Sequence, residues 1–427
     1  MSVNKLSLES LAAGFYVNIT RSLAPVFLAA IGYSIYDILW LNLQAYAAAT
    51  LLAYVLFKIR RILLNNLKKV LLTSHVLERV FWGLIPISHV LGFLPLCYSL
   101  AVMTTVPTSS LLNIAIYSLE GEEVKKTLYY RSSFGSFSNF VGSITAFLVV
   151  ASMEGTAKYF YLYAIAAAFG MISSLLVSMT EFAVKHGEEM GEEERIKSVN
   201  VFLFLLFLSS ASALIGAVWQ PYVMKSLKAA DYIAVAISTA QTITTIFSPF
   251  FWAKRSYRSF RIAIVLAATS PLLIAATKIP ELHVAIAVLY AFSMNGSSML
   301  ASFLFAELSK SREVVAFFLS FASSLSQLTG VAVAIFAGSL MFVASAFLFA
   351  FSLLISILAI PEVAYDVEKA RIYSRIFYGI SLSAYTFSIT LTTETALLAV
   401  RLAVLFTVFL LLTFLYRVSY YLIHGSA

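Results

Sequence analysis

Apolar residues run through this chain in long stretches that are separated by short polar segments. Each stretch lasts about 20 residues, which is the length that an α-helix needs to cross the hydrocarbon core of a bilayer. A strand of a membrane barrel would instead alternate apolar and polar residues. The pattern predicts helices over 11–32, 35–57, 70–88, 91–118, 134–152, 158–180, 199–222, 230–252, 260–278, 282–306, 314–336 and 339–360. Two further helices are predicted over 376–393 and 395–422.

The composition agrees with a lipid environment. Hydrophobic residues make up 61% of the chain and charged residues 12%, whereas soluble domains are about half apolar and about a quarter charged. In lipid every backbone polar group must be bonded inside a helix or a closed barrel. The sequence therefore predicts an all-α polytopic membrane protein, with no cleavable signal before the first helix.

The positive charges predict how the helices are oriented. If the N-terminus is cytoplasmic, most of the 29 lysines and arginines fall on the cytoplasmic side. The outer side receives Lys158, Lys225, Lys228, Lys278 and Arg401. Cytoplasmic loops are enriched in these residues, so both termini are predicted to be cytoplasmic in the plasma membrane. The net charge of +8 then reflects topology, and no nucleic-acid partner is expected.

Two sets of six helices are related by an internal repeat. At an offset of 188 positions, "SSLL" at 109–112 faces "SSML" at 297–300, and 134–147 faces 322–335. Upstream the offset is 196, which pairs Pro25 with Pro221 and Lys58 with Lys254. A parallel repeat of this kind occurs in secondary transporters. The sequence predicts a first half over 1–180, a cytoplasmic linker over 181–198, a second half over 199–361, and a segment over 362–427 with two additional helices.

Two parallel six-helix halves joined by a hydrophilic loop resemble the major facilitator superfamily of secondary transporters. Family members carry a motif close to Gly-x-x-x-Asp-Arg-x-Gly-Arg-Lys between the second and third helices of each half. The places are held here by "VLFKIRRILLNNLKK" (55–69) and "FFWAKRSYRSFR" (250–261), which keep the basic residues and lose the glycines and the aspartate. The resemblance implies a central cavity lined by the first, fourth, seventh and tenth helices, and a transport cycle of alternating access.

Polar interruptions occur at corresponding places of the fourth and tenth predicted helices, in "TTVPTSSLL" (104–112) and "FSMNGSSML" (292–300). Interrupted helices in matching positions of two halves point to a transporter's central site, because a broken helix frees backbone groups for a substrate. The structural alternative is that the small residues allow close helix packing and that Pro107 produces a kink without a functional role. The predicted lining comprises Asn18, Thr104, Thr105, Thr108, Ser109, Trp219, Gln220, Ser293, Asn295, Ser297 and Ser298, with Tyr222 helping Trp219 to close the outer side.

Charges near the middle of predicted helices are the other candidates, because an unpaired charge there costs at least about 2.5 to 3.5 kcal/mol. Arg21 is predicted to bind an anionic or polar group of a substrate, since a guanidinium is a fixed cation with a forked donor. Glu78 is the predicted proton-coupling residue. The structural alternative is that Arg21 and Glu78 pair across helices. Adjacent Glu78 and Arg79 project about 100° apart on a helix, so they are not expected to neutralise each other.

Other chemistries have little support in the sequence. Cys97 is the only cysteine, which excludes a disulfide within the chain and a cysteine zinc site. We find no nucleotide-binding or metal-dependent transferase motif, so no cofactor, no metal site and no enzymatic activity are predicted. The expected partners are the lipid bilayer and a small polar, anionic or amphipathic solute, with a co-transported proton as a further candidate. Two alternatives stay open: a lipid-linked oligosaccharide flippase of the multidrug/polysaccharide exporter type, and a scaffold or receptor without transport.

Overall fold

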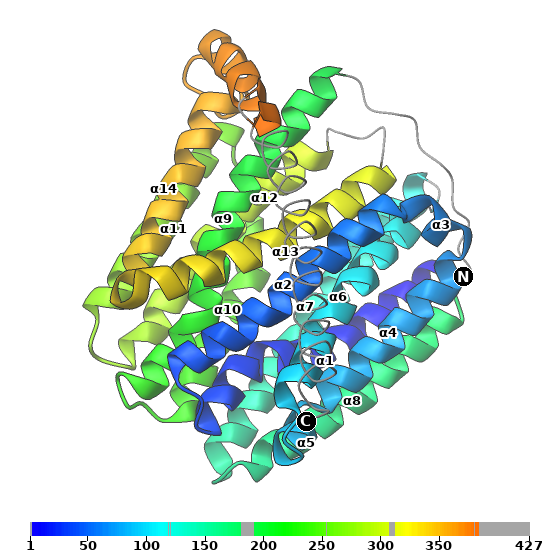
Figure 1. Cartoon of the computed structure of the whole chain (residues 1–427), viewed down its shortest axis with the longest axis vertical. Helices are drawn as coiled ribbons and strands as arrows, with labels where there is room; N and C mark the ends of the chain where they lie inside the picture. The colour runs from blue at the N-terminus through cyan, green and yellow to red at the C-terminus, as the bar shows by residue number, and fades with distance from the viewer. Residues whose placement is uncertain are drawn as a thin grey trace, which may run out of the picture. The chain divides into compact units, whose positions relative to one another are not determined.

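The protein is all-helical in the part of the chain that the computed structural model describes, which comprises residues 2–117, 119, 121–180, 192–252, 254–306, 312–379 and 381–383. The helices are α1 Ser2–Ala30, α2 Ile35–Lys58, α3 Arg60–Asn65, α4 Leu67–Gly83, α5 Ile85–Val90, α6 Leu94–Tyr117, α7 Gly121–Ser152, α8 Ala157–Ser178, α9 Glu192–Lys225, α10 Asp231–Trp252, η1 Tyr257–Ser259, α11 Phe260–Ala276, α12 Leu282–Ala306, α13 Arg312–Ala337, η2 Gly338–Leu340 and α14 Met341–Ala359. Figure 1 shows their arrangement.

Local sequence accounts for several helix ends. Ser34 begins α2 with a capping box: its hydroxyl accepts the backbone N–H of Asp37, and the Asp37 carboxylate accepts the N–H of Ser34 at 3.0 Å. Each bond satisfies a donor that the first helical turn leaves open. Gly32, in the turn before α2, has a φ of +106°, which residues with a Cβ rarely adopt. These signals set the tight connection between α1 and α2.

Ten segments of the described residues are long and apolar enough to cross a membrane. One of them, 316–359, contains two of the predicted spans, α13 and α14. The third predicted span, 70–88, is not among the ten segments, because its helix is divided at Leu84 into α4 and α5 and carries charged residues. The chain is a multi-pass membrane protein.

Several predicted boundaries were wrong. Helix α7 begins at Gly121, not at 134, and α9 begins at Glu192, so the last residues of the predicted linker over 181–198 are helical. Both extensions are polar, and a search for apolar spans cannot detect a helix that continues beyond the bilayer core. Residues 181–191 lie outside the described part of the chain, as do most residues of the predicted helices over 376–393 and 395–422.

The packing of helices repeats along the chain. In the first set, which comprises α1 to α8, α1 packs on α7 and α8, and α6 packs on α2 and α4. In the second set, which comprises α9 to α14, α9 packs on α13 and α14, and α12 packs on α10 and α11. Gly142 of α7 and Gly330 of α13, which are 188 positions apart, both mark close approaches. A methyl group at Gly142 would meet Asn18 Cβ at 3.3 Å, and one at Gly330 would meet Ala213 Cβ at 3.1 Å. Both sets therefore use the same helix pairs.

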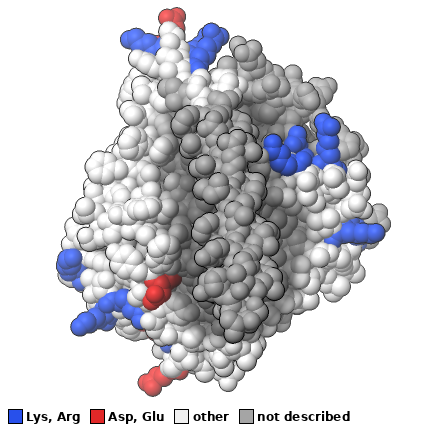
Figure 2. All heavy atoms as spheres, viewed as in Figure 1, with Lys and Arg blue, Asp and Glu red and all other residues white. Residues whose placement is uncertain are grey.

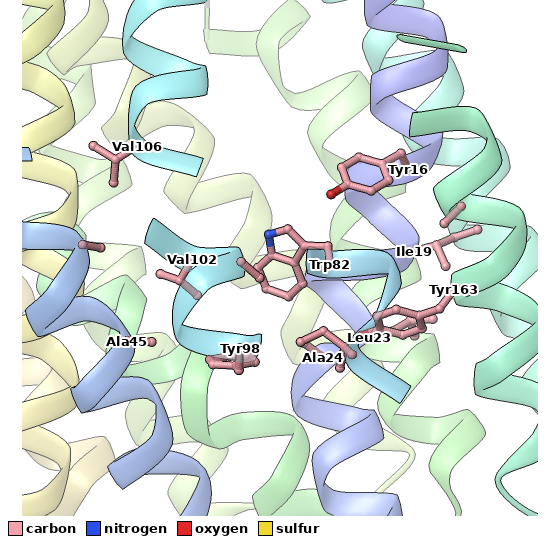
Figure 3. Close-up of a cluster of buried hydrophobic side chains, with 14 of the residues drawn as sticks. Tyr16, Ile19, Leu23, Ala24, Ala45, Trp82, Tyr98, Val102, Val106 and Tyr163 are labelled. Atoms are coloured by element: carbon pink, nitrogen blue, oxygen red, sulfur yellow. The ribbon is translucent and has the colours of Figure 1, made fainter. Parts of the chain in front are cut away.

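The two sets meet along α2 and α13 on one side and along α7 and α10 on the other. Figure 1 shows α2 and α13 lying side by side over much of their length. The hydrophobic core of the first set is built around α1 and α6, with Tyr16, Trp82, Tyr98 and Tyr163 buried among aliphatic side chains (Figure 3). These packed helices form one wall of the space between the two sets.

The end of the second set is held by polar contacts. Lys197 of α9 pairs with Glu362 at 2.6 Å, and Arg261 of α11 donates from Nε to the Val363 carbonyl at 2.6 Å. Residues 367–379 are helical after this point. Asp366 caps that helix, and the backbone N–H of Lys369 that its carboxylate accepts at 3.1 Å lowers the pKa of the carboxyl below its usual value.

Candidate functional site

A cavity of about 900 Å³ lies between the two sets of helices. Helices α1, α2, α4 and α6 supply one wall, and α9, α10, α12 and α13 supply the other. The polar side chains of the lining are Arg21, Ser22, Asn42, Tyr46, Trp82, Tyr98, Thr105, Ser109, Asn113, Ser209, Ser212, Trp219, Gln220, Ser238, Gln241, Thr242, Tyr290, Ser298, Ser320, Ser323, Ser324, Ser326 and Gln327. Hydroxyl and amide groups dominate the second wall, and aromatic rings accompany Arg21 in the first.

Arg21 is the one charged residue of this lining. Its Nη2 donates to Glu78 Oε1, and its Nε is buried without a hydrogen-bond partner among the described residues. About a third of the side chain is exposed. Because a guanidinium carries five N–H donors in a fixed plane, Arg21 can hold Glu78 with one edge and still offer donors to a solute.

Glu78 lies behind Arg21 and is fully buried. Its second oxygen accepts from Arg79 Nη1 at 2.5 Å, and the Tyr16 hydroxyl donates to its backbone carbonyl at 3.1 Å. The expectation that adjacent Glu78 and Arg79 do not neutralise each other was wrong. Arg79 is long enough to fold back across the helix, where its guanidinium lies 4.7 Å from the centre of the Tyr16 ring. The cross-helix pair of Arg21 and Glu78, which was the structural alternative for these two residues, is present.

Further buried polar groups continue from Arg79 through the first set of helices. Arg79 Nη2 donates to the Ser173 hydroxyl at 3.4 Å, and Ser173 donates to Glu9 Oε1 at 3.2 Å. Glu9 also pairs with Arg131 and lies 3.4 Å from His75 Nε2. Each buried carboxylate is thus matched by at least one guanidinium, as burial of charge requires.

The predicted residues of the first interrupted stretch divide into two groups. Thr105 and Ser109 line the cavity. Thr104 and Thr108 are turned onto their own helix, where their hydroxyls donate to the carbonyls of Leu100 and Thr104 at 2.8 Å. Helix α6 is continuous through Pro107, so the expected helix break was wrong. Side-chain hydroxyls that bond to backbone carbonyls one turn earlier are compatible with a helix that remains intact.

The second stretch behaves in the same way. Ser298 lines the cavity, whereas Ser293 and Ser297 are fully buried and donate to backbone carbonyls of α12. Asn295 donates to the Ser248 hydroxyl of α10. Helix α12 is also continuous, and Gly296 packs so closely on α10 and α11 that an added methyl group would lie 2.6 Å from the Trp252 ring. The packing alternative describes these residues better than the cavity.

Of the four remaining candidates, two line the cavity and two do not. Trp219 and Gln220 line it, and the Trp219 indole N–H is already bonded to His283 Nδ1 at 2.9 Å. Asn18 lies at the junction of the two sets, where its amide donates to Thr242 at 3.4 Å and its carbonyl accepts from Ser143 at 3.1 Å. Tyr222 packs on Phe342 of α14 and is not part of the lining.

The cavity also includes residues that the prediction omitted. Asn42 and Tyr46 come from α2, Gln241 from α10 and Gln327 from α13. Tyr98 donates to the Asn42 side chain at 2.7 Å, which fixes the amide orientation. Polar residues inside apolar helices were the available signal. The predicted lining relied on the interruptions in α6 and α12 and did not include residues of α2, α10 and α13.

Polar contacts also join the two sets of helices directly. Lys158, at the start of α8, pairs with Asp231 of α10 at 2.6 Å, and the Tyr159 hydroxyl donates to the same carboxylate at 3.0 Å. Lys158 Nζ also donates to the carbonyls of Val150 and Met153 at 3.2 Å. Deeper in the bundle, Ser143 of α7 donates to Thr242 of α10 at 3.0 Å.

Solved structures of known proteins resemble this chain in fold. The nucleoside transporter NupG superimposes with a TM-score of 0.60 at 14% identity, over 83% of this chain and 98% of that one. The D-xylose-proton symporter gives 0.61 at 13% identity, over 85% and 99%. FucP, a major facilitator superfamily transporter in the outward conformation, gives 0.56 at 13% identity, over 83% and 98%. No protein-family model matches the sequence, and no curated protein sequence matches it.

Proposed function

We propose that this chain, which has the fold of the major facilitator superfamily transporters, is a secondary active transporter of a small polar or anionic solute. The single observation that carries the proposal is the polar cavity of about 900 Å³ between the two helix sets. Ligand cavities of proteins span about 300 to 1,000 Å³, so this space suits one small solute. A hydroxyl or amide group inside an apolar helix bundle costs free energy unless it forms hydrogen bonds with a ligand or with another polar group.

The two walls have different tasks in this proposal. Arg21 orients an anionic or hydrogen-bond-accepting group of the solute, with Glu78 fixing the guanidinium from behind. Gln241 and Gln327 from the opposite wall bond to the polar remainder, together with Thr105, Ser109, Gln220 and Ser298. We exclude Thr104, Thr108, Ser293, Asn295 and Ser297 from the site, because they do not line the cavity and their polar groups bond within or between helices.

Alternating access between the halves 1–180 and 199–361 is part of the proposal. The Lys158–Asp231 pair closes the end that the charge distribution assigns to the outer side, with both termini in the cytoplasm of a plasma-membrane protein. The Lys158–Asp231 pair can separate without leaving a buried charge unpaired. Lys158 keeps two carbonyl partners in its own half, and Asp231 stays in the first turn of α10, where the helix dipole favours a carboxylate.

A co-transported proton remains a proposal with Glu78 as the candidate carrier. Glu78 contacts Arg21 and Arg79, and both guanidiniums would have to be compensated when the carboxylate takes up a proton. A solute anion on Arg21 would supply part of that compensation. NupG is described as a nucleoside transporter and the xylose protein as a proton symporter, and these names suggest polar solutes and protons as the first choices to test.

Ligand-induced stabilisation tests the site directly. The purified chain in detergent would be heated with a library of polar and anionic metabolites, because a ligand that binds only the folded state raises the unfolding midpoint. Gln241→Ala should abolish the shift. The matched control Gln44→Ala should preserve it, since Gln44 lies on α2 outside the cavity. Uptake of the ligand into proteoliposomes then separates transport from binding without flux, as a receptor would show. Stabilisation only by polyprenyl phosphates would favour a flippase.

A further inference from the structure

The two loops that keep basic residues but lose the family glycines and aspartate have a structural feature in common. In each, basic side chains lie against exposed or half-buried aromatic rings at the end of a membrane helix. We define the first patch as Tyr54, Phe57, Lys58, Ile59, Arg60, Arg61, Ile62, Lys68 and Lys69, and the second patch as Phe250, Phe251, Lys254, Arg255 and Arg258. We propose that these two patches bind the headgroups of anionic phospholipids.

The first patch presents charge and apolar surface together. Lys58 Nζ lies 5.4 Å from the centre of the Tyr54 ring, and the Arg60 guanidinium lies 4.8 Å from that of Phe57. Ile62 of α3 is 67% exposed. Long basic side chains that lie along apolar surface with their charge at the end are typical of membrane interfaces, and aromatic residues are enriched there.

The second patch repeats this arrangement at the offset of 196 positions. Lys254 corresponds to Lys58 and Phe250 to Tyr54. The Arg255 guanidinium lies 4.4 Å from the centre of the Phe251 ring, and Phe250 is 72% exposed. Both halves thus place the same combination at the same end of the bundle, although the glycines and aspartate of the family motif are absent from both.

The charges of the patches have no acidic partners in the part of the chain that the structure describes. Segments 55–69 and 250–261 contain no Asp or Glu. None of the eight basic side chains of the two patches forms an ion pair with another described residue. On the face in Figure 2, Lys and Arg side chains lie towards the helix ends, including a group on the side where α3 lies.

Anionic lipid fits these patches better than a soluble partner does. Each patch joins two membrane helices through a short connection, so its basic groups lie at the depth of lipid headgroups. Each Lys or Arg near an anionic bilayer surface adds to the attraction, and exposed Ile62 and Phe250 would insert beside the acyl chains, as interfacial helices do. This inference concerns the lipid surface and does not depend on transport.

Binding of fluorescent phosphatidylglycerol to the purified full chain in detergent tests the proposal. Replacing Lys58, Arg61 and Lys69 by Gln, or Lys254, Arg255 and Arg258 by Gln, should weaken binding at the altered patch by roughly tenfold or more, since three charges are removed there. The matched control replaces Lys225, Lys228 and Lys278 by Gln at the opposite helix ends, and binding should be unchanged. Phosphatidylcholine should bind weakly to all variants.

The outcomes separate the lipid from other sources of the effect. Replacement of Lys58, Lys68 and Lys69 by Arg keeps the charge and should preserve binding, which distinguishes lost charge from lost folding. Equal weakening by the control triple would overturn the proposal, and so would equal binding of phosphatidylcholine. Competition by glycerol 3-phosphate as strong as that by the lipid would reassign the patches to small phosphates. Circular dichroism of each variant verifies its helix content.

Discussion

Replacing Glu78 by Gln tests whether this carboxylate holds the first set of helices together. Glu78 is fully buried between Arg21 and Arg79, and Arg79 is only 3% exposed. Removal of the charge leaves Arg79 in the bundle without its countercharge. Breaking a buried ion pair on one side costs about 3 to 5 kcal/mol. Arg21 contributes less to this loss, because a third of its side chain reaches the cavity and is screened there.

The assay is the free energy of unfolding in mixed micelles, followed by circular dichroism as the denaturing detergent is increased. Glu78→Gln should lower the free energy by about 3 kcal/mol or more. The double variant Glu78→Gln/Arg79→Gln should be clearly more stable than the single one, because no orphaned charge remains beside Ser173. Glu154→Gln is the matched control, and this exposed carboxyl should change the free energy by less than about 0.5 kcal/mol.

Two results would refute this reasoning. If Glu78→Gln costs less than about 1 kcal/mol, the pair with Arg79 is not structural. If the double variant is as unstable as the single one, an orphaned guanidinium is not the cause. Unchanged stability together with transport that no longer responds to a proton gradient would instead identify Glu78 as the proton carrier.

Three further predictions concern the helix contacts. Asp231→Asn should weaken the contact with Lys158 and so favour opening of the cavity to the outer side. In a Cys97→Ser background, a cysteine introduced at a cavity position should then be labelled from that side roughly tenfold faster, because a loss of about 1.4 kcal/mol shifts an equilibrium tenfold. An unchanged labelling rate would show that the Lys158 contact does not gate the cavity. Gly330→Ala should cost about 1 to 3 kcal/mol of unfolding free energy through overpacking against α9, whereas Gly216→Ala, which points into open space, should be neutral or stabilising. Tyr98→Phe should cost about 1 to 2 kcal/mol by leaving the Asn42 carbonyl without its donor, and a stability equal to that of the unmodified chain would contradict this role.

The long apolar runs determined the membrane class and most of the spanning helices of the described part before any tertiary information, although the span predicted over 70–88 is divided into α4 and α5. A span is a local property, because about 20 apolar residues in one helix suffice to cross a bilayer. The internal repeat could also be detected in the sequence, since Gly142 and Gly330 recur with their neighbours at a fixed offset. In the structure both glycines lie where two helices approach closely. Helices that begin in polar sequence, as at Gly121 and Glu192, could not be predicted from hydrophobicity.

The composition of the cavity was decided by tertiary structure. Thr104 and Thr105 are adjacent and chemically equal, yet only Thr105 lines the cavity. The difference comes from the rotation of α6 against α2 and α4, and a single residue step turns a side chain by about 100°. Sequence patterns identify polar residues in a helix but not which helix they will face.

Pairing of charges was the other feature that depended on the fold. The sequence showed that Arg21, Glu78 and Arg79 lie in apolar helices, where burial demands a partner. It could not show that Arg79 folds back onto its neighbour Glu78, or that Glu9 and Arg131 continue the network from helices far apart in the chain. Local hydrophobicity fixes which segments enter the membrane, because insertion depends on each helix alone. Which polar groups meet inside depends on helix rotation and long-range packing, and only the assembled bundle sets these.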